Sequence, residues 1–160
     1  LSIKYKASSR LFSCKNNNLI FLEMIKPRDS YYTVSSVTGY PIPLNATASG
    51  KIVLAHMEKE ELEYYLNRES FVKYTAKTLV EKEDLLMEAK KVYENGYSIE
   101  NEEIEYGIYS VACPIYDHTK KLIGTISLTG YVGILKDQTD EIIADMTDYS
   151  KKITKELTGL

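Results

Sequence analysis

Tryptophan is absent from this 160-residue sequence, and cysteine and histidine occur only twice each. Cys14 and Cys113 lie far apart in strand-like segments, so we expect buried thiols in a reducing compartment and no disulfide framework. A nucleophile needs a base within reach, usually histidine. His56 and His118 have no triad spacing, and we expect both to be surface or helix-end residues. Zinc-ligand spacing and a glycine-rich phosphate loop are also missing. The sequence therefore predicts no catalytic residue, no metal and no cofactor.

Long apolar runs and a strong charge of either sign are missing as well. No run approaches the ~20 residues of a membrane span, so we expect a cytoplasmic protein without a membrane partner. The net charge of −3 gives no support for a nucleic-acid surface on this chain. No signal peptide is visible, and Leu1 is not a natural start, so we expect a fragment. Residues 1–10 are polar and weakly patterned and are expected to be a residual linker, with one domain over residues 11–160.

The most informative stretch is a predicted hairpin over residues 106–130, with a turn near residues 117–121. Side chains in a strand alternate between two faces. One face of the second strand therefore carries three hydroxyls, and its residues are Ile123, Thr125, Ser127 and Thr129. The other face carries Leu122, Gly124, Ile126 and Leu128 and is typical of a core.

The register of this hairpin decides what the hydroxyl face contains. If Tyr116 lies opposite Ile123, then Ser110 lies opposite Thr129 and Ala112 opposite Ser127. Ser110, Ser127 and Thr129 would then form one small polar patch. A polar alternation is also typical of a solvated face, and the sequence alone favours that interpretation.

The remaining patterns predict an α+β domain with an antiparallel sheet and helices packed on it. Two strands, 11–15 and 19–25, flank an Asn-rich turn, and a third strand is expected over 31–37. Helices are predicted over 59–66 and, after a Thr78–Glu81 capping box, up to Gly96. Residues 97–105 are expected to be an acidic connector. The last helix is expected to begin with Asp137 or Thr139 as its cap and to end at Gly159.

A helix is also predicted within residues 45–57, capped by Asn45 or Thr47. Its first turn contains Ala48, Ser49 and Gly50, which leave the backbone N–H groups open to approach. Such a helix start suits a carboxylate or another anion. Tight packing of the helix on a sheet also requires small residues, so both interpretations stay open.

Two segments resemble a known family. Residues 43–51, Pro-Leu-Asn-Ala-Thr-Ala-Ser-Gly-Lys, resemble the Pro-Leu-His-Ala-Thr-Ala-x-Gly-Lys signature of the IclR family of bacterial transcription regulators. A second set of segments is similar to another signature of this family. It consists of Gly-Tyr-Ser from Gly96 followed by acidic residues, then Val-Ala-Cys-Pro-Ile-Tyr-Asp ending at Asp117, and then Ser-Leu-Thr-Gly ending at Gly130. The sequence departs from the family at Asn45, where histidine is usual.

The resemblance implies a GAF-like, C-terminal effector-binding domain. DNA would be contacted only through an N-terminal winged helix-turn-helix missing here, and the protein would be a homodimer or tetramer that responds to a small organic acid. By position, the family's pocket residues correspond to Ala48, Ser49, Glu100, Ile108, Ser110, Ser127 and Thr129, with an apolar wall from Tyr31, Val34 and Ile42.

These features together predict how an effector would bind. A carboxylate would dock on the N–H groups of Ala48 and Ser49, with the hydroxyls of Ser127 and Thr129 around it. Two alternatives stay open. One is a hydrolase that uses Ser110 or Cys113, and the other is a purely structural oligomerisation module.

Overall fold

The computed structural model describes residues 1–28 and 41–159. The described strands form one five-stranded antiparallel sheet in the order β2-β1-β5-β4-β3. Their bounds are β1 Ser8–Lys15, β2 Asn18–Ile25, β3 Ser98–Asn101, β4 Ile108–Tyr116 and β5 Leu122–Tyr131. The helices are α1 Ser2–Tyr5, α2 Ala48–Ala55, α3 Lys59–Arg68, α4 Lys82–Asn95, α5 Val132–Leu135 and α6 Thr139–Thr158, with a 3₁₀ turn over Lys136–Gln138. The strand expected over 31–37 lies outside the described residues.

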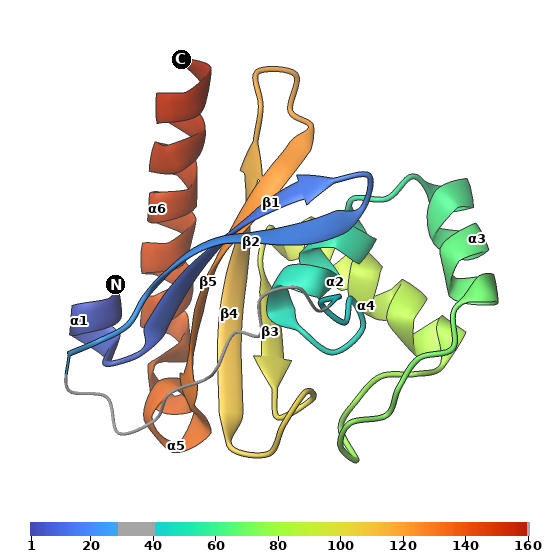
Figure 1. Cartoon of the computed structure of the whole chain (residues 1–160), viewed down its shortest axis with the longest axis horizontal. Coiled ribbons are helices and arrows are strands. Elements are labelled where there is room, and N and C mark those ends of the chain that lie inside the picture. The colour runs from blue at the N-terminus through green and yellow to red at the C-terminus, as the bar shows by residue number, and fades with distance from the viewer. Residues whose placement is uncertain (29–40, 160) are drawn as a thin grey trace.

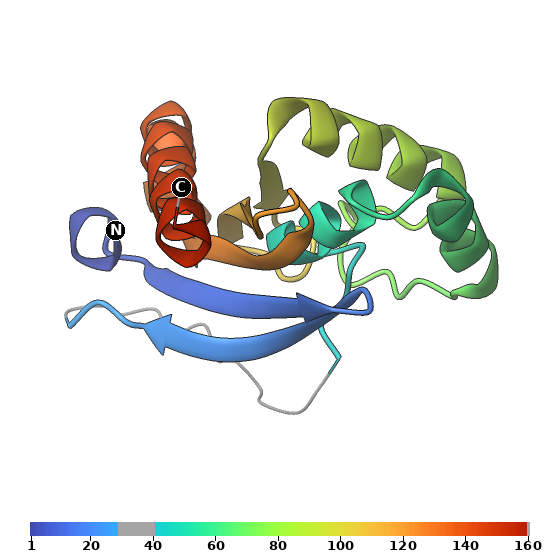
Figure 2. The same ribbon diagram turned by 90° about the horizontal axis from the view of Figure 1, so that it is seen from above.

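Helices cover both faces of the central strands. Figure 1 shows α6 along one face of β4 and β5, whereas α2 and α4 lie on the other face. From above, the β1–β2 hairpin extends the sheet beneath both groups of helices (Figure 2). One core cluster joins α6 to the sheet through residues such as Val111, Leu128 and Met146. On the opposite side, Ala48 and Ile52 of α2 pack with Ala112 of β4. The expected α+β architecture is confirmed.

The β4–β5 hairpin has the expected register over most of its length. Ser110 lies opposite Thr129 and Ala112 opposite Ser127. The expected pairing of Tyr116 with Ile123 is wrong, because Tyr116 lies opposite Leu122 and the register shifts after Ile115. An extra residue in one strand exchanges the faces beyond it. Ile123 therefore packs on the α6 side, and Leu122 packs on the α2 side.

The first ten residues fold as part of the sheet and core. They contain α1 and the beginning of β1, and Tyr5 and Ala7 are almost completely buried. The Tyr5 hydroxyl donates to an Asp145 carboxylate oxygen of α6 at 2.7 Å. The polar composition of this segment hid these contacts, since Ser2 and Ser8 are buried along with Tyr5 and Ala7.

Three local expectations were wrong. Thr78 does not cap α4. The N-cap residue of α4 is Glu81, whose side chain forms no capping hydrogen bond with a described residue. Instead, the Thr78 hydroxyl donates to the Glu103 carbonyl at 2.6 Å, because the chain around residue 103 lies beside it. The N-cap of α6 is Gln138, again without a side-chain bond. The acidic connector contains an edge strand, β3, which pairs with β4, and only Glu100 of its four residues is charged. Thr47 caps the N-terminus of α2, and Gly96 and Gly159 cap the C-termini of α4 and α6, as expected.

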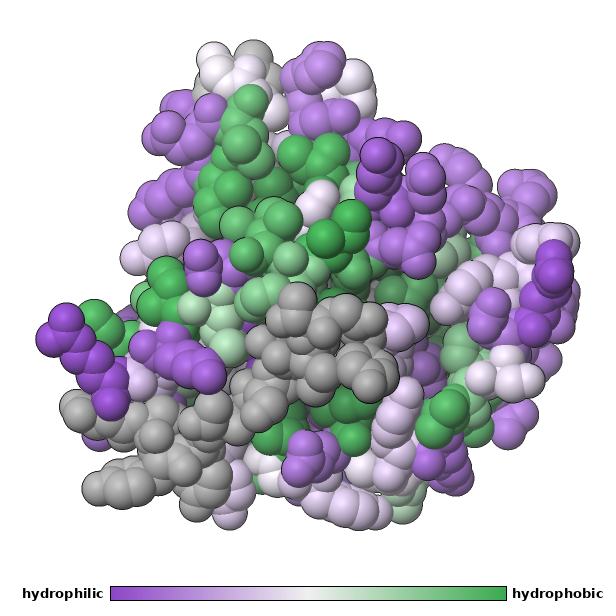
Figure 3. Space-filling model, in the orientation of Figure 1, coloured by the Kyte–Doolittle hydropathy of each residue, from purple (hydrophilic) through white to green (hydrophobic). Residues whose placement is uncertain are grey.

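The surface divides into a hydrophilic and a more apolar part. In the orientation of Figure 1, the area over α3 is mainly hydrophilic, and hydrophobic surface lies near the β1–β2 hairpin and α6 (Figure 3). Ile20, Leu22 and Ile25 of edge strand β2 are 49%, 53% and 62% exposed. Among the described residues, none of the helices has the length and apolar composition required to cross a bilayer.

Candidate effector site

The hydroxyl face of β5 is buried beneath α2. Ser110, Ser127 and Thr129 are 6%, 3% and 4% exposed, so the interpretation as a solvated face is wrong. Glu100 of β3 lies opposite Ser110 and extends the same face toward the sheet edge. The register therefore brings four of the predicted site residues from three neighbouring strands onto one buried surface.

Helix α2 reaches this surface through its small residues. Ala48 packs against Ala112, and the Ser98 hydroxyl donates to the Ala48 carbonyl at 2.6 Å. A Cβ atom on Gly50 would lie 2.4 Å from the Cα atom of Leu44, so only glycine allows this close approach. Ser127 lies opposite Ala112, and directly opposed residues have Cβ atoms about 5 Å apart. The helix start thus lies close to the hydroxyl face.

Several polar groups at this point have no partner within residues 1–28 and 41–159. Thr47 caps α2 by accepting from the Gly50 amide at 3.1 Å, which leaves the Ala48 and Ser49 amides without a bond to a described residue. The buried Ser49 hydroxyl has no partner either. The hydroxyls of Ser127 and Thr129 likewise form no hydrogen bond with described residues. Buried polar groups are normally satisfied, so such a concentration is typical of a binding site.

Glu100 is an acidic group whose charge is costly at its position. Its Oε1 atom accepts the amides of Glu103 and Ile104 at 2.8 and 3.3 Å, and its Oε2 atom accepts the Ser110 hydroxyl at 3.0 Å. Burial raises the pKa of Glu100 to about 7, although these hydrogen bonds oppose the shift. Glu100 therefore changes protonation close to neutral pH.

The other predicted residues are distributed around this face. Ile108 is the first residue of β4, is half-buried and projects from the same face as Ser110. Ile42 is also half-buried and lies shortly before α2. Tyr31 and Val34 fall outside the described residues.

Arg10 is a candidate site residue that the sequence did not reveal. It lies on β1 directly opposite Ser127, with Ser8 opposite Thr129 and Phe12 opposite Thr125. Its side chain therefore projects from the hydroxyl face. Burial lowers the pKa of the Arg10 guanidinium, and the Glu100 charge opposes this shift. The alternation of Ser8, Arg10 and Phe12 was the available signal, and assigning residues 1–10 to a linker concealed it.

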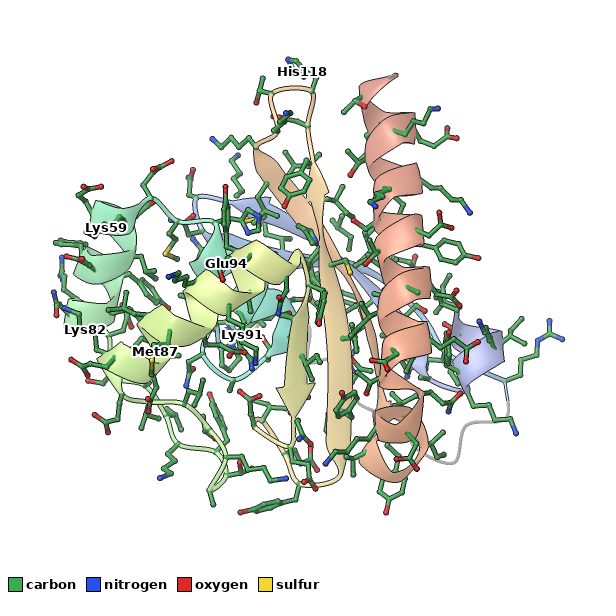
Figure 4. All side chains as sticks on the ribbon, turned by 180° about the vertical axis from the view of Figure 1, so that it is seen from behind. Lys59, Lys82, Met87, Lys91, Glu94 and His118 are labelled. Atoms are coloured by element: carbon green, nitrogen blue, oxygen red, sulfur yellow. The ribbon has the colours of Figure 1, made fainter. Side chains whose placement is uncertain are left out.

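The geometry does not support a hydrolase. Burial raises the pKa of the Cys113 thiol to about 11, so the reactive thiolate is disfavoured. His56 is half-buried at the end of α2, and its Nε2 atom accepts the Tyr116 hydroxyl at 2.7 Å. His118 lies at the tip of the β4–β5 hairpin (Figure 4), and the extended residues of β4 between it and Ser110, at about 3.3 Å each, place it roughly 20 Å from that serine. The described residues contain no group of His, Cys, Asp and Glu arranged to hold a metal.

A separate cleft of about 500 Å³ lies where α4 meets edge strand β3. Its lining includes Lys51, Glu88, Tyr97, Asn101 and Glu103, and none of the described residues predicted for the effector site. Lys51 forms ion pairs with Glu103 at 2.7 Å and with Glu88 at 3.1 Å. The Asn101 Oδ1 and Glu103 Oε2 atoms of this lining have no partner among the described residues. We do not assign the effector to this cleft, because none of the described residues predicted for the effector site lines it.

Comparison with known proteins agrees with this architecture. The protein-family description "Bacterial transcriptional regulator IclR C-terminal" matches residues 1–155. The transcriptional regulator XynR of Escherichia coli is 30% identical over 110 residues, which are 69% of this chain and 43% of XynR. The crystal structure of Thermotoga maritima IclR is also similar, with 26% identity and a TM-score of 0.85. This match covers 96% of the present chain and 62% of the Thermotoga chain.

A third similar structure is known with a bound ligand. It is a double mutant of the inducer-binding domain of the Acinetobacter transcription factor PobR, in complex with 3-hydroxybenzoic acid. The match covers 96% of the present chain and 90% of the PobR chain. Its identity is 14% and its TM-score is 0.84, so it shares the fold. The chain spans about half the length of the curated relatives that it matches. The expected family is therefore confirmed: this chain belongs to the C-terminal, effector-binding domains of IclR-type bacterial transcriptional regulators.

Proposed function

We propose that this domain binds a small organic acid between the first turn of α2 and the hydroxyl face of β5. The observation that carries the proposal is a set of buried donors without a partner among the described residues: the Ala48 and Ser49 amides and the hydroxyls of Ser49, Ser127 and Thr129. A helix N-terminus and neutral donors hold an anion without a buried lysine. The hydroxy acid bound by the similarly folded PobR domain supports this ligand class.

Binding would control a DNA-binding segment that lies outside this chain. An effector shifts a protein between two arrangements only by the difference in its affinity for them. We propose that the two arrangements are those of a homodimer or tetramer in the cytoplasm, whose DNA-binding heads move with the effector domains. Exposed Ile20, Leu22 and Ile25 on β2 provide apolar surface that a second copy would cover. Sedimentation with and without effector tests this arrangement, and an unchanged monomer would contradict it.

A thermal-shift screen of small organic acids tests binding directly. A ligand at ~100 times its dissociation constant adds about 2.7 kcal/mol to the free energy of unfolding. For a domain of this size, that corresponds to a melting temperature about 5–10 °C higher. If no acid raises the melting temperature, the structural oligomerisation module becomes the better explanation.

Calorimetric titration of site variants then locates the bound acid. Ser127→Ala combined with Thr129→Ala removes two donors to a charged ligand, each worth about 1.5–3 kcal/mol. We expect affinity to fall about hundredfold or more. Thr147→Val is the control, because it removes a hydroxyl from α6, which lies on the opposite face of the sheet. Equal affinity in the double variant and the control would contradict the site.

A further inference from the structure

The cleft between α4 and β3 contains buried hydrogen-bond acceptors that lack a donor. Glu103 is 8% exposed, and its Oε1 atom accepts from Lys51 Nζ at 2.7 Å and from the Asn101 amide at 3.3 Å. Its Oε2 atom and the Asn101 Oδ1 atom accept no hydrogen bond from a described residue. Both residues line the cleft, and the terminal torsions of Asn and Glu are soft, so a small rotation turns these oxygens toward a ligand. A ligand with N–H donors would satisfy both.

The floor of the cleft also has an excess of negative charge. Lys51 faces two carboxylates, those of Glu88 and Glu103, whose side chains are 18% and 10% exposed. Its N–H donors are all used, on these carboxylates and on the Ile99 carbonyl. Lys91 lies 3.8 Å from Glu88, but its side chain is 70% exposed, so solvent weakens this contact. The floor therefore favours one further cationic group.

The mouth of the cleft, formed by the exposed lining residues Lys91 and Lys136, is positively charged. Figure 4 shows Lys91 on α4 beside β3. The Lys136 amino group forms no ion pair or hydrogen bond with a described residue. Lys77 also lines the cleft, but it is paired with Glu102. Positive charge at the mouth disfavours a simple amine and favours a ligand whose outer end is a carboxylate.

Apolar side chains complete the lining. Leu79, Val92 and Ile99 are half-buried or buried residues of the cleft, and they would contact the uncharged part of a ligand. The cleft volume of about 500 Å³ lies within the range of roughly 300–1,000 Å³ that is typical of small-ligand pockets. The cleft thus combines an anionic floor, apolar walls and a cationic mouth.

We infer that this cleft is a second binding site, and that its ligand is a free amino acid with an apolar side chain. The ammonium group of the ligand contacts Glu103 Oε2 and Asn101 Oδ1, and its carboxylate faces Lys91 and Lys136. The site goes beyond the proposed function, because its lining includes none of the described residues predicted for the effector site.

Matched sets of compounds test this selectivity by calorimetric titration. Each set contains an amino acid, its decarboxylated amine and its deaminated acid. The sets are leucine, isopentylamine and isocaproate, and phenylalanine, phenethylamine and hydrocinnamate. The titrations use the wild-type chain and the Ser127→Ala, Thr129→Ala variant, in which the proposed effector site is impaired. We expect at least one amino acid to bind both proteins equally, and its amine and acid to bind the variant about tenfold more weakly or worse. If neither amino acid binds, or the amine or acid binds the variant as tightly, the inference is overturned.

Variants of the floor and the mouth locate the ligand. Glu103→Gln keeps one oxygen for Lys51 and replaces the unpartnered oxygen by an N–H donor group, so amino-acid affinity should fall about ten- to hundredfold. Glu105→Gln is the matched control, because it removes an exposed carboxylate of the same segment that does not line the cleft. Lys136→Gln should weaken binding of the amino acid and leave binding of the amine unchanged or improved. Equal affinities in Glu103→Gln and Glu105→Gln overturn the inference.

The outcomes separate this inference from the proposed function. If organic acids bind and amino acids do not, the inference fails and the proposed function stands. If amino-acid binding is lost in the Ser127→Ala, Thr129→Ala variant, the amino acid occupies the effector site and the inference again fails. Should Glu103→Gln not fold, Asn101→Ala removes the second acceptor and leaves the ion pairs of Lys51 intact. We then expect amino-acid affinity about tenfold lower, and an unchanged affinity counts against the inference.

Discussion

Lys51→Met should destabilise the domain more than any surface substitution, because Lys51 is a buried cation that holds three elements together. Its side chain is only 3% exposed. Its Nζ atom donates to Glu88 Oε1 of α4 at 3.1 Å, to the Ile99 carbonyl of β3 at 2.7 Å and to Glu103 Oε1 at 2.7 Å. An ammonium group has three N–H donors, so all of them are used.

The expected loss follows from the groups that the substitution would leave behind. Methionine keeps most of the apolar length of lysine and removes the charge. The Glu103 carboxylate then stays buried without its cation, and its Oε2 atom already has no partner. Removing one member of a buried ion pair costs about 3–5 kcal/mol. For a domain of this size, the melting temperature should fall by about 6–20 °C.

Urea denaturation at neutral pH measures this loss. Lys90→Met is the matched control, because the Lys90 side chain is 78% exposed and its nitrogen lies 3.9 Å from the Glu94 carboxylate on the same helix. Its effect should stay within about 0.5 kcal/mol. Adding Glu103→Leu to Lys51→Met removes the stranded carboxylate and should restore at least half of the lost stability. A loss below about 1 kcal/mol for Lys51→Met, or strictly additive effects in the double variant, would refute this reasoning.

Three further substitutions test other parts of the structure. The pKa of Glu100 is raised from 4.5 to about 7, so the folded state binds one more proton than the unfolded state between these pH values. The free energy of unfolding should therefore fall by about 3 kcal/mol as the pH rises through this range. Glu100→Gln should flatten this dependence in urea titrations at pH 5 and 8. Gly50→Ala would place a Cβ atom 2.4 Å from the Leu44 backbone, and calorimetry should show a loss of about 2 kcal/mol or more together with weaker effector binding. Tyr116→Phe removes the hydrogen bond to His56, and thermal denaturation should show a loss of about 1 kcal/mol, which an unchanged melting temperature would contradict.

Local patterns predicted much of the candidate site. The alternation in residues 122–129 and the turn near residue 119 placed Ser110 opposite Thr129, because a two-residue period and a loop length together constrain register. The small residues at the start of α2 predicted close packing, which the structure has between Ala48 and Ala112 of β4 and between Gly50 and the preceding Leu44, and Thr47 was among the expected caps. These features depend on residues near one another in the chain.

Other features depend on contacts between distant segments, and their prediction failed. The bulge at Ile123 lets Leu122 pack toward α2, which no period-two pattern indicates. Thr78 had the spacing of a capping box, yet the neighbouring Glu103 carbonyl takes its hydroxyl proton. Strand β3, within the acidic connector, pairs with β4, and Lys51 from α2 donates to its Ile99 carbonyl.

The sequence by itself determined the family, the α+β class and the existence of a hydroxyl face, since these follow from motifs and from the periodicity of short segments. Only the tertiary structure decided that this face is buried and that Arg10 and Glu100 lie at its two sides. The physical reason is that burial and charge pairing depend on which helix covers a strand and which strands become neighbours. In this chain, the packing of α2 and the insertion of β5 between β1 and β4 settle both points.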